Sequence, residues 1–221
     1  MKSIILFPFV FLFAVVQLYA QSSLGIDIQT YSPTGEMNKN VSGTPAGLSF
    51  RYLRSTSDTW SFGGELGIAM YSSETYMMET SSGEIEMYEE DCFWTIHGMA
   101  QYTLFQSETV RYYAEGRVGL TNFFSDKMAE DEEYDEYDHF ESHGTAFNMG
   151  IGNGLTINTG KLFTGSKGGF NIDLGVNLHS GTRTNYRNIN NDDSVVSNLD
   201  EGDYRSLTHY VAYRFGVLID L

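Results

Sequence analysis

Apolar and polar residues alternate with a period of two along most of this chain. Residues 210–221 show the pattern most clearly, with an unbroken apolar row at Tyr213, Phe215, Val217, Ile219 and Leu221. The residues at the alternate positions of this segment include Tyr210, Ala212, Arg214, Gly216 and Asp220. Successive side chains of a strand point to opposite faces, so one face is apolar and the other is mixed. This pattern is typical of a strand with lipid on its apolar face and the crowded inside of a small barrel on the other.

Eight segments share this alternation, and no helical periodicity separates them. They cover residues 24–31, 46–54, 60–71, 92–104, 110–121, 146–158, 170–180 and about 205–221. Lipid cannot form hydrogen bonds with the backbone groups at the open edge of a sheet, so strands that cross a membrane must close into a barrel. The sequence therefore predicts an all-β fold, an eight-stranded antiparallel up-and-down transmembrane β-barrel.

The connections between these segments alternate in length. Residues 32–45, 72–91, 122–145 and 181–204 are long, residues 55–59 and 105–109 are tight, and residues 159–169 are intermediate. Outer-membrane barrels have short periplasmic turns and longer extracellular loops. We therefore expect four long external loops on one side and short periplasmic turns on the other.

The N-terminus has the layout of a secretory signal peptide. Lys2 precedes an apolar run over residues 4–16, and Leu18-Tyr19-Ala20 forms a cleavage site before Gln21. The run is shorter than the ~20 residues of a membrane-spanning helix. We expect residues 1–20 to be the signal peptide and residues 21–221 to be a single barrel domain. Cys92 is the only cysteine, so the fold contains no internal disulfide.

The signal sequence, the eight alternating strands, the four long loops and the aromatic C-terminal strand together resemble the small outer-membrane β-barrel family of the OmpA and OmpX type. Leu221 stands where the family usually has a terminal Phe. The resemblance covers the mature chain and includes no catalytic motif. It implies a location in the cell outer membrane of a Gram-negative bacterium and a membrane-structural, adhesive or partner-binding role.

The acidic residues are concentrated in the expected loops. The formal net charge is −16, and 22 of the 29 acids lie in the four long connections. Nucleic acid is negatively charged and would be repelled by this acidic face, whereas divalent cations and a protein partner are candidate ligands. The densest part is a candidate cation-binding loop with Asp131, Glu132, Glu133, Asp135, Glu136 and Asp138. The alternative, which we favour, is a solvated acidic surface, because the loop lacks the regular Asp spacing and Gly of an EF-hand.

A second candidate site is the set of charged residues in the inward register. These are the acids Asp27, Glu65, Glu115 and Asp173 and the arginines Arg51, Arg111, Arg117 and Arg214. Buried charges need partners, so we expect complementary pairs such as Glu65 with Arg51 on the neighbouring strand. An eight-stranded barrel is barely wide enough for its own side chains, which favours a polar plug over an ion path.

Enzymatic and ligand-carrying alternatives have less support. His179 and Ser180 lie at the expected outer rim, where a lipid A-modifying acyl hydrolase or transferase would act. Adjacent strand residues point to opposite faces, however, so these two cannot pair as base and nucleophile. The inward charges also disfavour a soluble, lipocalin-type barrel with an apolar ligand.

We therefore expect a non-enzymatic outer-membrane barrel without cofactor or bound metal. Its expected partners are outer-membrane lipids, with divalent cations or a protein at the acidic loops, and it acts as a monomer or as a subunit of an envelope complex. A narrow pore or a lipid A-modifying enzyme is the alternative.

Overall fold

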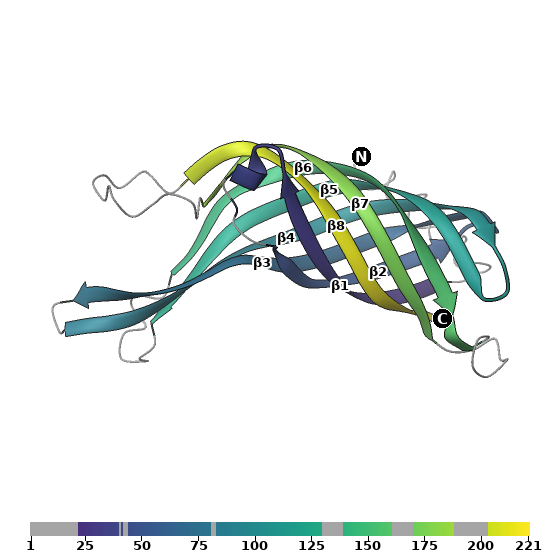
Figure 1. The fold of residues 1–221 in the computed structure, drawn as a ribbon, viewed down its shortest axis with the longest axis horizontal. Coiled ribbons are helices and arrows are strands. Elements are labelled where there is room, and N and C mark those ends of the chain that lie inside the picture. Colours follow the sequence, from purple (N-terminus) through teal and green to yellow (C-terminus); the bar gives the residue numbers. More distant parts are fainter. Residues whose placement is uncertain are drawn as a thin grey trace, which may run out of the picture.

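Eight antiparallel strands close into a barrel in the computed structural model, which describes residues 22–39, 41, 44–80, 83–129, 139–160, 170–187 and 203–221 (Figure 1). The strands are β1 (Ser22–Thr34), β2 (Ala46–Ser55), β3 (Trp60–Thr80), β4 (Gly83–Gln106), β5 (Val110–Ala129), β6 (His139–Asn158), β7 (Phe170–Arg187) and β8 (Asp203–Asp220), with a short 3-10 helix, η2 (Met37–Lys39), after β1. Each strand pairs with the next, and β8 pairs with β1. The expected fold class is confirmed.

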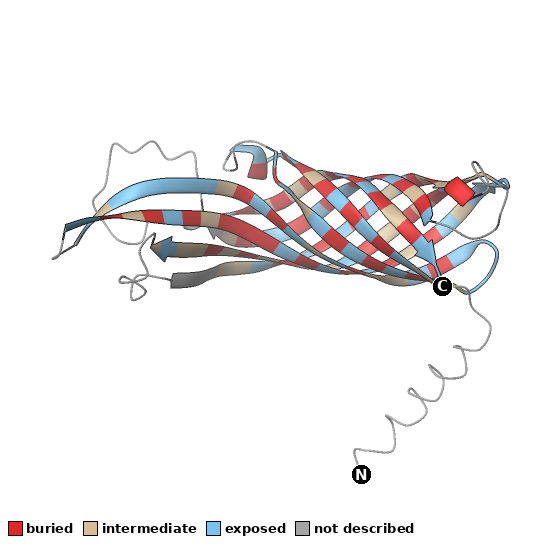
Figure 2. Cartoon of the chain, turned by 90° about the horizontal axis from the view of Figure 1, so that it is seen from below, coloured by how far each residue is buried: buried red, intermediate tan, exposed pale blue. Residues whose placement is uncertain are grey.

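Residues alternate between the inside and the outside of the barrel as the period of two requires. On β1, Ile26 and Ile28 are each 56% exposed, whereas Asp27 between them is fully buried. Figure 2 shows the same alternation of buried and exposed residues across the wall of the barrel. A water-soluble barrel has the opposite arrangement, with apolar residues inside. Here the apolar side chains face outward and the charges face inward, which is the arrangement of a barrel that spans the outer membrane.

The apolar outer band matches the thickness of a membrane. On β3 the outward residues are apolar or glycine from Trp60 to Met70, and the next outward residue is Ser72. On β6 the band ends at Phe147, because the next outward residue toward the long-loop end is Thr145. These two strands thus each contribute about ten residues, the length that a tilted strand needs to cross the hydrocarbon. No helix among the described residues is long and apolar enough to cross a membrane. The expected signal peptide, residues 1–20, lies outside the described residues.

The strands on the long-loop side are longer than the sequence indicated. Residues 72–91, expected as a loop, instead continue β3 and β4, which stay paired as far as Thr80 opposite Gly83. In the same way β5 continues to Ala129 and β6 begins at His139. The expectation failed because it relied on polarity, whereas Thr, Tyr, Met and Ile in these segments are compatible with strands and antiparallel pairing satisfies their backbone. Residues 181–204, also expected as a loop, likewise continue β7 to Arg187, which pairs with Asp203 of β8. Six strands, β3 to β8, therefore project beyond the apolar band as an extension of the barrel (Figure 1).

Glycines on the inner face let the walls of this narrow barrel hold their polar contents. Gly119 is an inward residue of β5, directly opposite His97 of β4. A Cβ atom at Gly119 would lie 1.9 Å from the carbonyl oxygen of Ile96 and 2.7 Å from the Cα of His97. Gly116, an outward residue of the same strand, has open space there, with nothing within 4 Å. The two positions differ only in which face of the wall they occupy.

We expect Gly119→Ala to destabilise the folded barrel by roughly 1–3 kcal/mol, because the added methyl group overlaps backbone atoms that cannot move away cheaply. Gly116→Ala is the matched control and should leave stability unchanged. The fraction of heat-modifiable protein on an unboiled detergent gel, measured across a urea series in vesicles, checks both. Equal stability of the two variants would contradict the inner-wall placement of Gly119.

Candidate functional site

A line of alternating acids and arginines crosses the lumen of the barrel. At one end, Arg51 on β2 donates from Nη2 to Asp27 Oδ1 on β1 at 3.0 Å and to Asp173 Oδ2 on β7 at 2.9 Å. All three side chains are fully buried. One guanidinium therefore holds two carboxylates that come from opposite ends of the sequence.

The line continues through the second half of the barrel. Arg214 on β8 donates from Nε to Asp173 at 3.2 Å and from Nη1 to Glu115 Oε1 on β5 at 3.0 Å. Arg117, two residues further along β5, donates from Nε to Glu115 at 2.9 Å and from Nη1 to Glu65 Oε1 on β3 at 2.6 Å. The lumen network therefore runs in the order Asp27, Arg51, Asp173, Arg214, Glu115, Arg117, Glu65.

Neutral side chains connect the remaining strands to the lumen network. Gln101 on β4 donates to Glu115 at 3.0 Å, and Thr156 on β6 donates to Asp173 at 2.8 Å. Tyr113 on β5 donates to both oxygens of Asp173 and accepts from Arg214 Nη2 at 2.6 Å. All eight strands thus contribute to one hydrogen-bonded layer. In a medium of low dielectric such a layer is stable only when nearly every charge has a partner.

Two expectations about these charges need correction. Glu65 lies directly opposite Arg51 in the β2–β3 register, but it pairs with Arg117, and Arg51 pairs with Asp27 and Asp173. The long side chains reach across the lumen instead of along the wall. Arg111 is not part of the network. It lies nearer the short-turn end, where its Nη2 is 3.4 Å from Thr156 Oγ1 and its guanidinium lies 5.3 Å from the ring centre of Tyr113.

An aromatic plug fills the lumen on the long-loop side of the network. It is formed by Tyr31, Tyr71, Phe93, Phe123 and Tyr210, with ring centres of neighbouring pairs 5.0 to 6.5 Å apart. Met37 of η2 and Val41 are buried in the same cluster. The sequence analysis missed this plug, although its aromatic residues continue the inward register of their strands. The network and the plug together close the barrel interior.

His179 was expected at the outer rim of the barrel, but β7 continues past it to Arg187. His179 therefore lies inside the barrel. It is buried and stacks on Tyr210 with ring centres 4.6 Å apart, and the ring of His97 is 5.3 Å away. Ser180 is exposed on the outer face. The structure therefore separates this histidine from both its neighbouring hydroxyl and the lipid.

A Ser–His–Asp cluster occurs farther out in the lumen, but its geometry differs from that of a catalytic triad. The hydroxyl of Ser125 on β5 contacts His143 Nε2 at 2.6 Å and donates to Asp91 Oδ1 on β4. In a triad the histidine lies between the acid and the nucleophile. Here the serine lies between the other two, and Ser125 and Asp91 are buried. The arrangement supports a structural hydrogen-bonded cluster.

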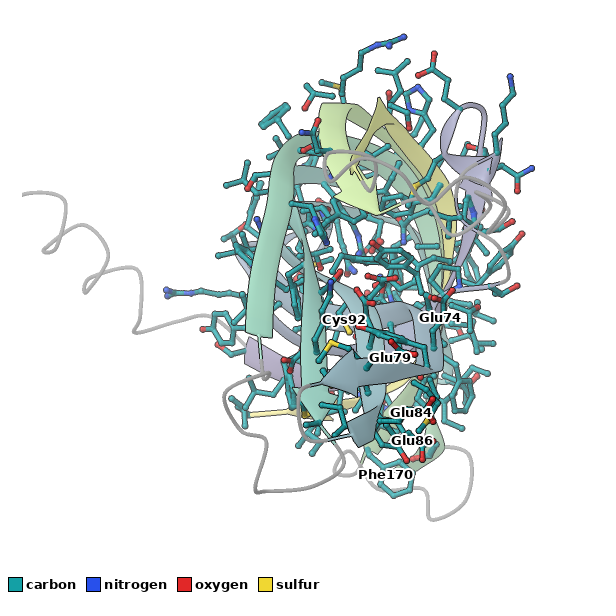
Figure 3. The ribbon with its side chains drawn as sticks, turned by 90° about the vertical axis from the view of Figure 1, so that its left-hand side faces the viewer. Glu74, Glu79, Glu84, Glu86, Cys92 and Phe170 are labelled. Atoms are coloured by element: carbon teal, nitrogen blue, oxygen red, sulfur yellow. The ribbon has the colours of Figure 1, made fainter. Side chains whose placement is uncertain are left out.

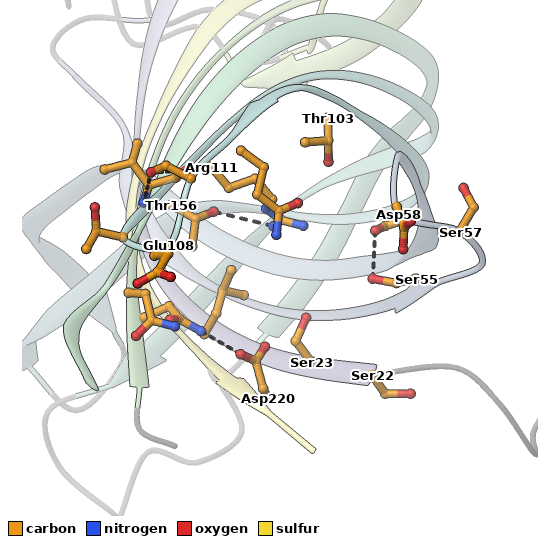
Figure 4. A pocket seen from close by; sticks show the side chains of 18 of the residues that line it. Ser22, Ser23, Ser55, Ser57, Asp58, Thr103, Glu108, Arg111, Thr156 and Asp220 are labelled. Atoms are coloured by element: carbon orange, nitrogen blue, oxygen red, sulfur yellow. Dashed lines mark hydrogen bonds between the residues drawn. The ribbon is translucent and has the colours of Figure 1, made fainter. Parts of the chain in front are cut away.

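A polar vestibule of about 720 Å³ opens at the short-turn end of the barrel (Figure 4). Its lining is rich in serine and threonine and includes Asp58, Glu108, Asp220 and Arg111. Asp220 accepts a hydrogen bond from Asn171 at 2.9 Å. Thr156 lies between the vestibule and the lumen network, because it contacts both Arg111 and Asp173. The vestibule therefore ends at the ionic layer.

The extension on the long-loop side is acidic. Its described side chains include four glutamates of the β3–β4 hairpin: Glu79, Glu84 and Glu86 on one face and Glu74 on the other (Figure 3). Lys127 on β5 pairs with Glu89 at 3.3 Å. The expected cation-binding residues between Asp131 and Asp138 lie outside the described residues. Within the described part of the chain, no three acidic, histidine or cysteine side chains are grouped closely enough to hold a metal ion.

The fold is similar to the solved structures of small outer-membrane barrels. Ail, the attachment invasion locus protein of Yersinia pestis, solved with the heparin analogue sucrose octasulfate, is 13% identical with a TM-score of 0.47, and the match covers 91% of this chain and 97% of Ail. Neisserial surface protein A is 10% identical with a TM-score of 0.46, over 91% and 96% of the two chains. The N-terminal β-barrel domain of OprF from Pseudomonas aeruginosa is 14% identical with a TM-score of 0.36, over 92% and 100%. No protein-family model and no curated protein sequence matches the chain.

We expect Arg51→Met to destabilise the barrel by about 3–5 kcal/mol, because it leaves the buried carboxylates of Asp27 and Asp173 without their shared guanidinium. Arg111→Met is the control and should cost less than about 1 kcal/mol, since Arg111 is outside the network and forms no ion pair in the described part of the chain. Urea unfolding in phospholipid vesicles measures both. Similar losses for the two variants would contradict the network as drawn.

We also expect the folded protein to give no steady unitary current in planar bilayers, because the lumen network and the aromatic plug fill its interior. The control is the same preparation after heat denaturation. Stable, reproducible conductance steps that disappear on denaturation would instead favour the narrow pore.

Proposed function

We propose that this protein is a non-enzymatic outer-membrane anchor that presents its acidic extension to a basic polypeptide partner. The observation that supports this proposal best is the β3–β4 hairpin beyond the apolar band. Residues 71–91 contain seven acids and no lysine or arginine. A surface of one charge sign attracts partners of the opposite sign and raises their rate of association.

The hairpin also has an open edge. The last β2–β3 pair is Ala46 with Met70, so among the strands that the structure describes residues 72–80 of β3 pair with β4 alone. The backbone groups on the far side of such a strand can accept an added strand from another polypeptide. An extended segment with lysine or arginine at alternate positions would satisfy both the open edge and the charge of the hairpin.

Like charges within the hairpin favour such a partner. Glu79 lies directly opposite Glu84. Carboxylates in directly opposite positions destabilise a strand pair. A basic partner would relieve that repulsion, and divalent cations would compete for the same carboxylates. The acidic extension gives no support for a polyanion such as the sulfated ligand in the Ail structure.

The closed interior favours this role over the pore, and the position of His179 favours it over the enzyme. His179 and the Ser125–His143–Asp91 cluster face the lumen, where neither can reach an acyl chain in the surrounding lipid. The extension remains the part of the molecule that is accessible from outside the membrane.

The experiment uses the full-length mature barrel in nanodiscs and a fluorescent decapeptide of alternating lysine and valine. We expect replacement of Glu74, Glu79, Glu84 and Glu86 by glutamine to weaken binding at least about tenfold at low salt, because four attractive charges are lost. Fluorescence anisotropy measures the affinity. The control variant carries Asp58→Asn and Glu108→Gln at the opposite end of the barrel and should bind as the wild type does.

Two further measurements separate charge attraction from strand addition. Higher ionic strength and added calcium should both weaken binding, because the contact is electrostatic. A peptide with alternate backbone nitrogens methylated should bind more weakly than the unmodified peptide if it adds to the edge of β3. Unchanged affinity in the four-glutamine variant would refute the proposal.

A further inference from the structure

One arginine lies on the membrane-facing wall near the short-turn end of the barrel. Arg54 is directly opposite Phe62 in the β2–β3 register, and Phe62 is 48% exposed on the outer wall. Directly opposite residues of paired strands lie on the same face of the sheet, so Arg54 is also an outward residue. Arg111, near the same end of the barrel, instead lines the vestibule.

Arg54 has no counter-ion on the described part of the chain. Its side chain is half-buried, and its Nε and Nη2 atoms are shielded from solvent without a hydrogen-bond partner there. Asp58, the nearest acid along the chain, lies in the lining of the vestibule and forms no ion pair with Arg54. A guanidinium is always charged and carries five N–H donors. On an apolar wall it therefore needs an anionic partner.

Two hydroxyl groups flank Arg54 on the same wall. Ser22, at the rim of the barrel, is directly opposite Arg54 in the β1–β2 register, and its Oγ lies 3.1 Å from the hydroxyl of Tyr52 (Figure 4). When two hydroxyl groups bond to each other, one hydrogen is shared between the oxygens and the other remains a donor. The wall thus brings together a guanidinium and a hydroxyl donor, and such groups bind the oxygens of a phosphate.

The level of Arg54 corresponds to that of the lipid headgroups. Four outward aromatic residues, each 40% to 43% exposed, gather at the short-turn ends of β2 to β5: Tyr52, Trp60, Tyr102 and Tyr112. The ring of Trp60 stacks on that of Phe62 with centres 5.7 Å apart, and the Tyr102 ring is 5.0 Å from Trp60. Aromatic girdles of this kind mark the boundary between hydrocarbon and headgroups. An arginine beside them can place its stem in the apolar layer and its guanidinium among the headgroups.

We propose that Arg54, Ser22 and Tyr52 form a binding site for the phosphate of a phospholipid in the periplasmic leaflet. The phosphate diester supplies the negative charge that Arg54 lacks, and the rings of Trp60 and Phe62 contact the acyl chains of the same lipid. Free phosphate offers the same oxygens, but a site on an apolar wall favours the phosphate that carries acyl chains. A lipid held here fixes the depth of the barrel and therefore the height of the acidic extension above the membrane.

The fluorescence of Trp60 tests the proposal. The chain has two tryptophans, so Trp94→Phe leaves Trp60 as the single reporter beside the site. The mature barrel is placed in mixed vesicles of phosphatidylcholine and digalactosyl diacylglycerol, which are both uncharged overall and of which only the first contains phosphate. Quenching by a brominated form of each lipid in turn gives their relative affinities at Trp60. We expect phosphatidylcholine to be preferred about threefold, the scale of an exposed ion pair.

Variants at both arginines identify the group that recognises the phosphate. Arg54→Gln should abolish the preference, whereas Arg54→Lys, which keeps the charge, should retain most of it. Arg111→Gln is the matched control and should leave the preference unchanged, because it removes an arginine of the vestibule at the same end of the barrel. Heat-modifiable gel mobility shows that each variant is folded. A folded Arg54→Gln variant with the wild-type preference, or a wild type with none, would overturn the proposal.

Inorganic phosphate separates the two sources of the ligand. Added at the same ionic strength as a sodium chloride control, it should leave the lipid preference unchanged, because free phosphate lacks the acyl chains that contact Trp60 and Phe62. Loss of the preference in phosphate but not in chloride would assign the site to free phosphate and overturn the lipid as its occupant.

Discussion

The rest of this structure depends on the pairing of charges inside the barrel. Four carboxylates and three guanidinium groups lie in one layer, out of contact with water. Each arginine holds two acids, and Asp173 and Glu115 each accept from two arginines. Removing Arg51 leaves the buried Asp27 without its ion-pair partner, and removing Arg117 does the same to Glu65. The ion pairs connect six strands, and Gln101 and Thr156 add the other two. An eight-stranded barrel has room for such side chains and for little else.

This constraint determines where function can reside. The network and the aromatic plug occupy the lumen, so transport through the interior and catalysis from the lumen both lack a route. What remains accessible is the polar vestibule at one end, the acidic extension at the other and the wall between them. The extension consists of paired strands, which hold Glu79 and Glu84 at fixed positions where a flexible loop would let them separate. A rigid display of like charges is costly on its own, and the partner that we propose would offset this cost.

The outer surface follows the same chemistry with lipid as the solvent. Ile26, Phe50 and Leu66 are each more than half exposed, which would be unfavourable in water and is favourable in hydrocarbon. Asn153 is the exception within this band. In the lumen the charged groups of the network find partners on the other strands.

The sequence by itself determined the fold class, the number of strands and the face of each residue. Alternation is a local property: once residues 24–31 form a strand, Asp27 must point opposite to Ile26 and Ile28, whatever the rest of the chain does. For this reason the sequence identified all seven charged residues of the lumen network. Only the tertiary structure decided which of them pair. Glu65 and Arg51 are neighbours in register, yet the reach of their side chains across a closed lumen gives Glu65 to Arg117 and Arg51 to two acids. The same closure excluded Arg111 from the network, placed His179 against Tyr210, and carried β3 and β4 beyond the membrane, because contacts across a barrel depend on its radius and stagger, which no single strand encodes.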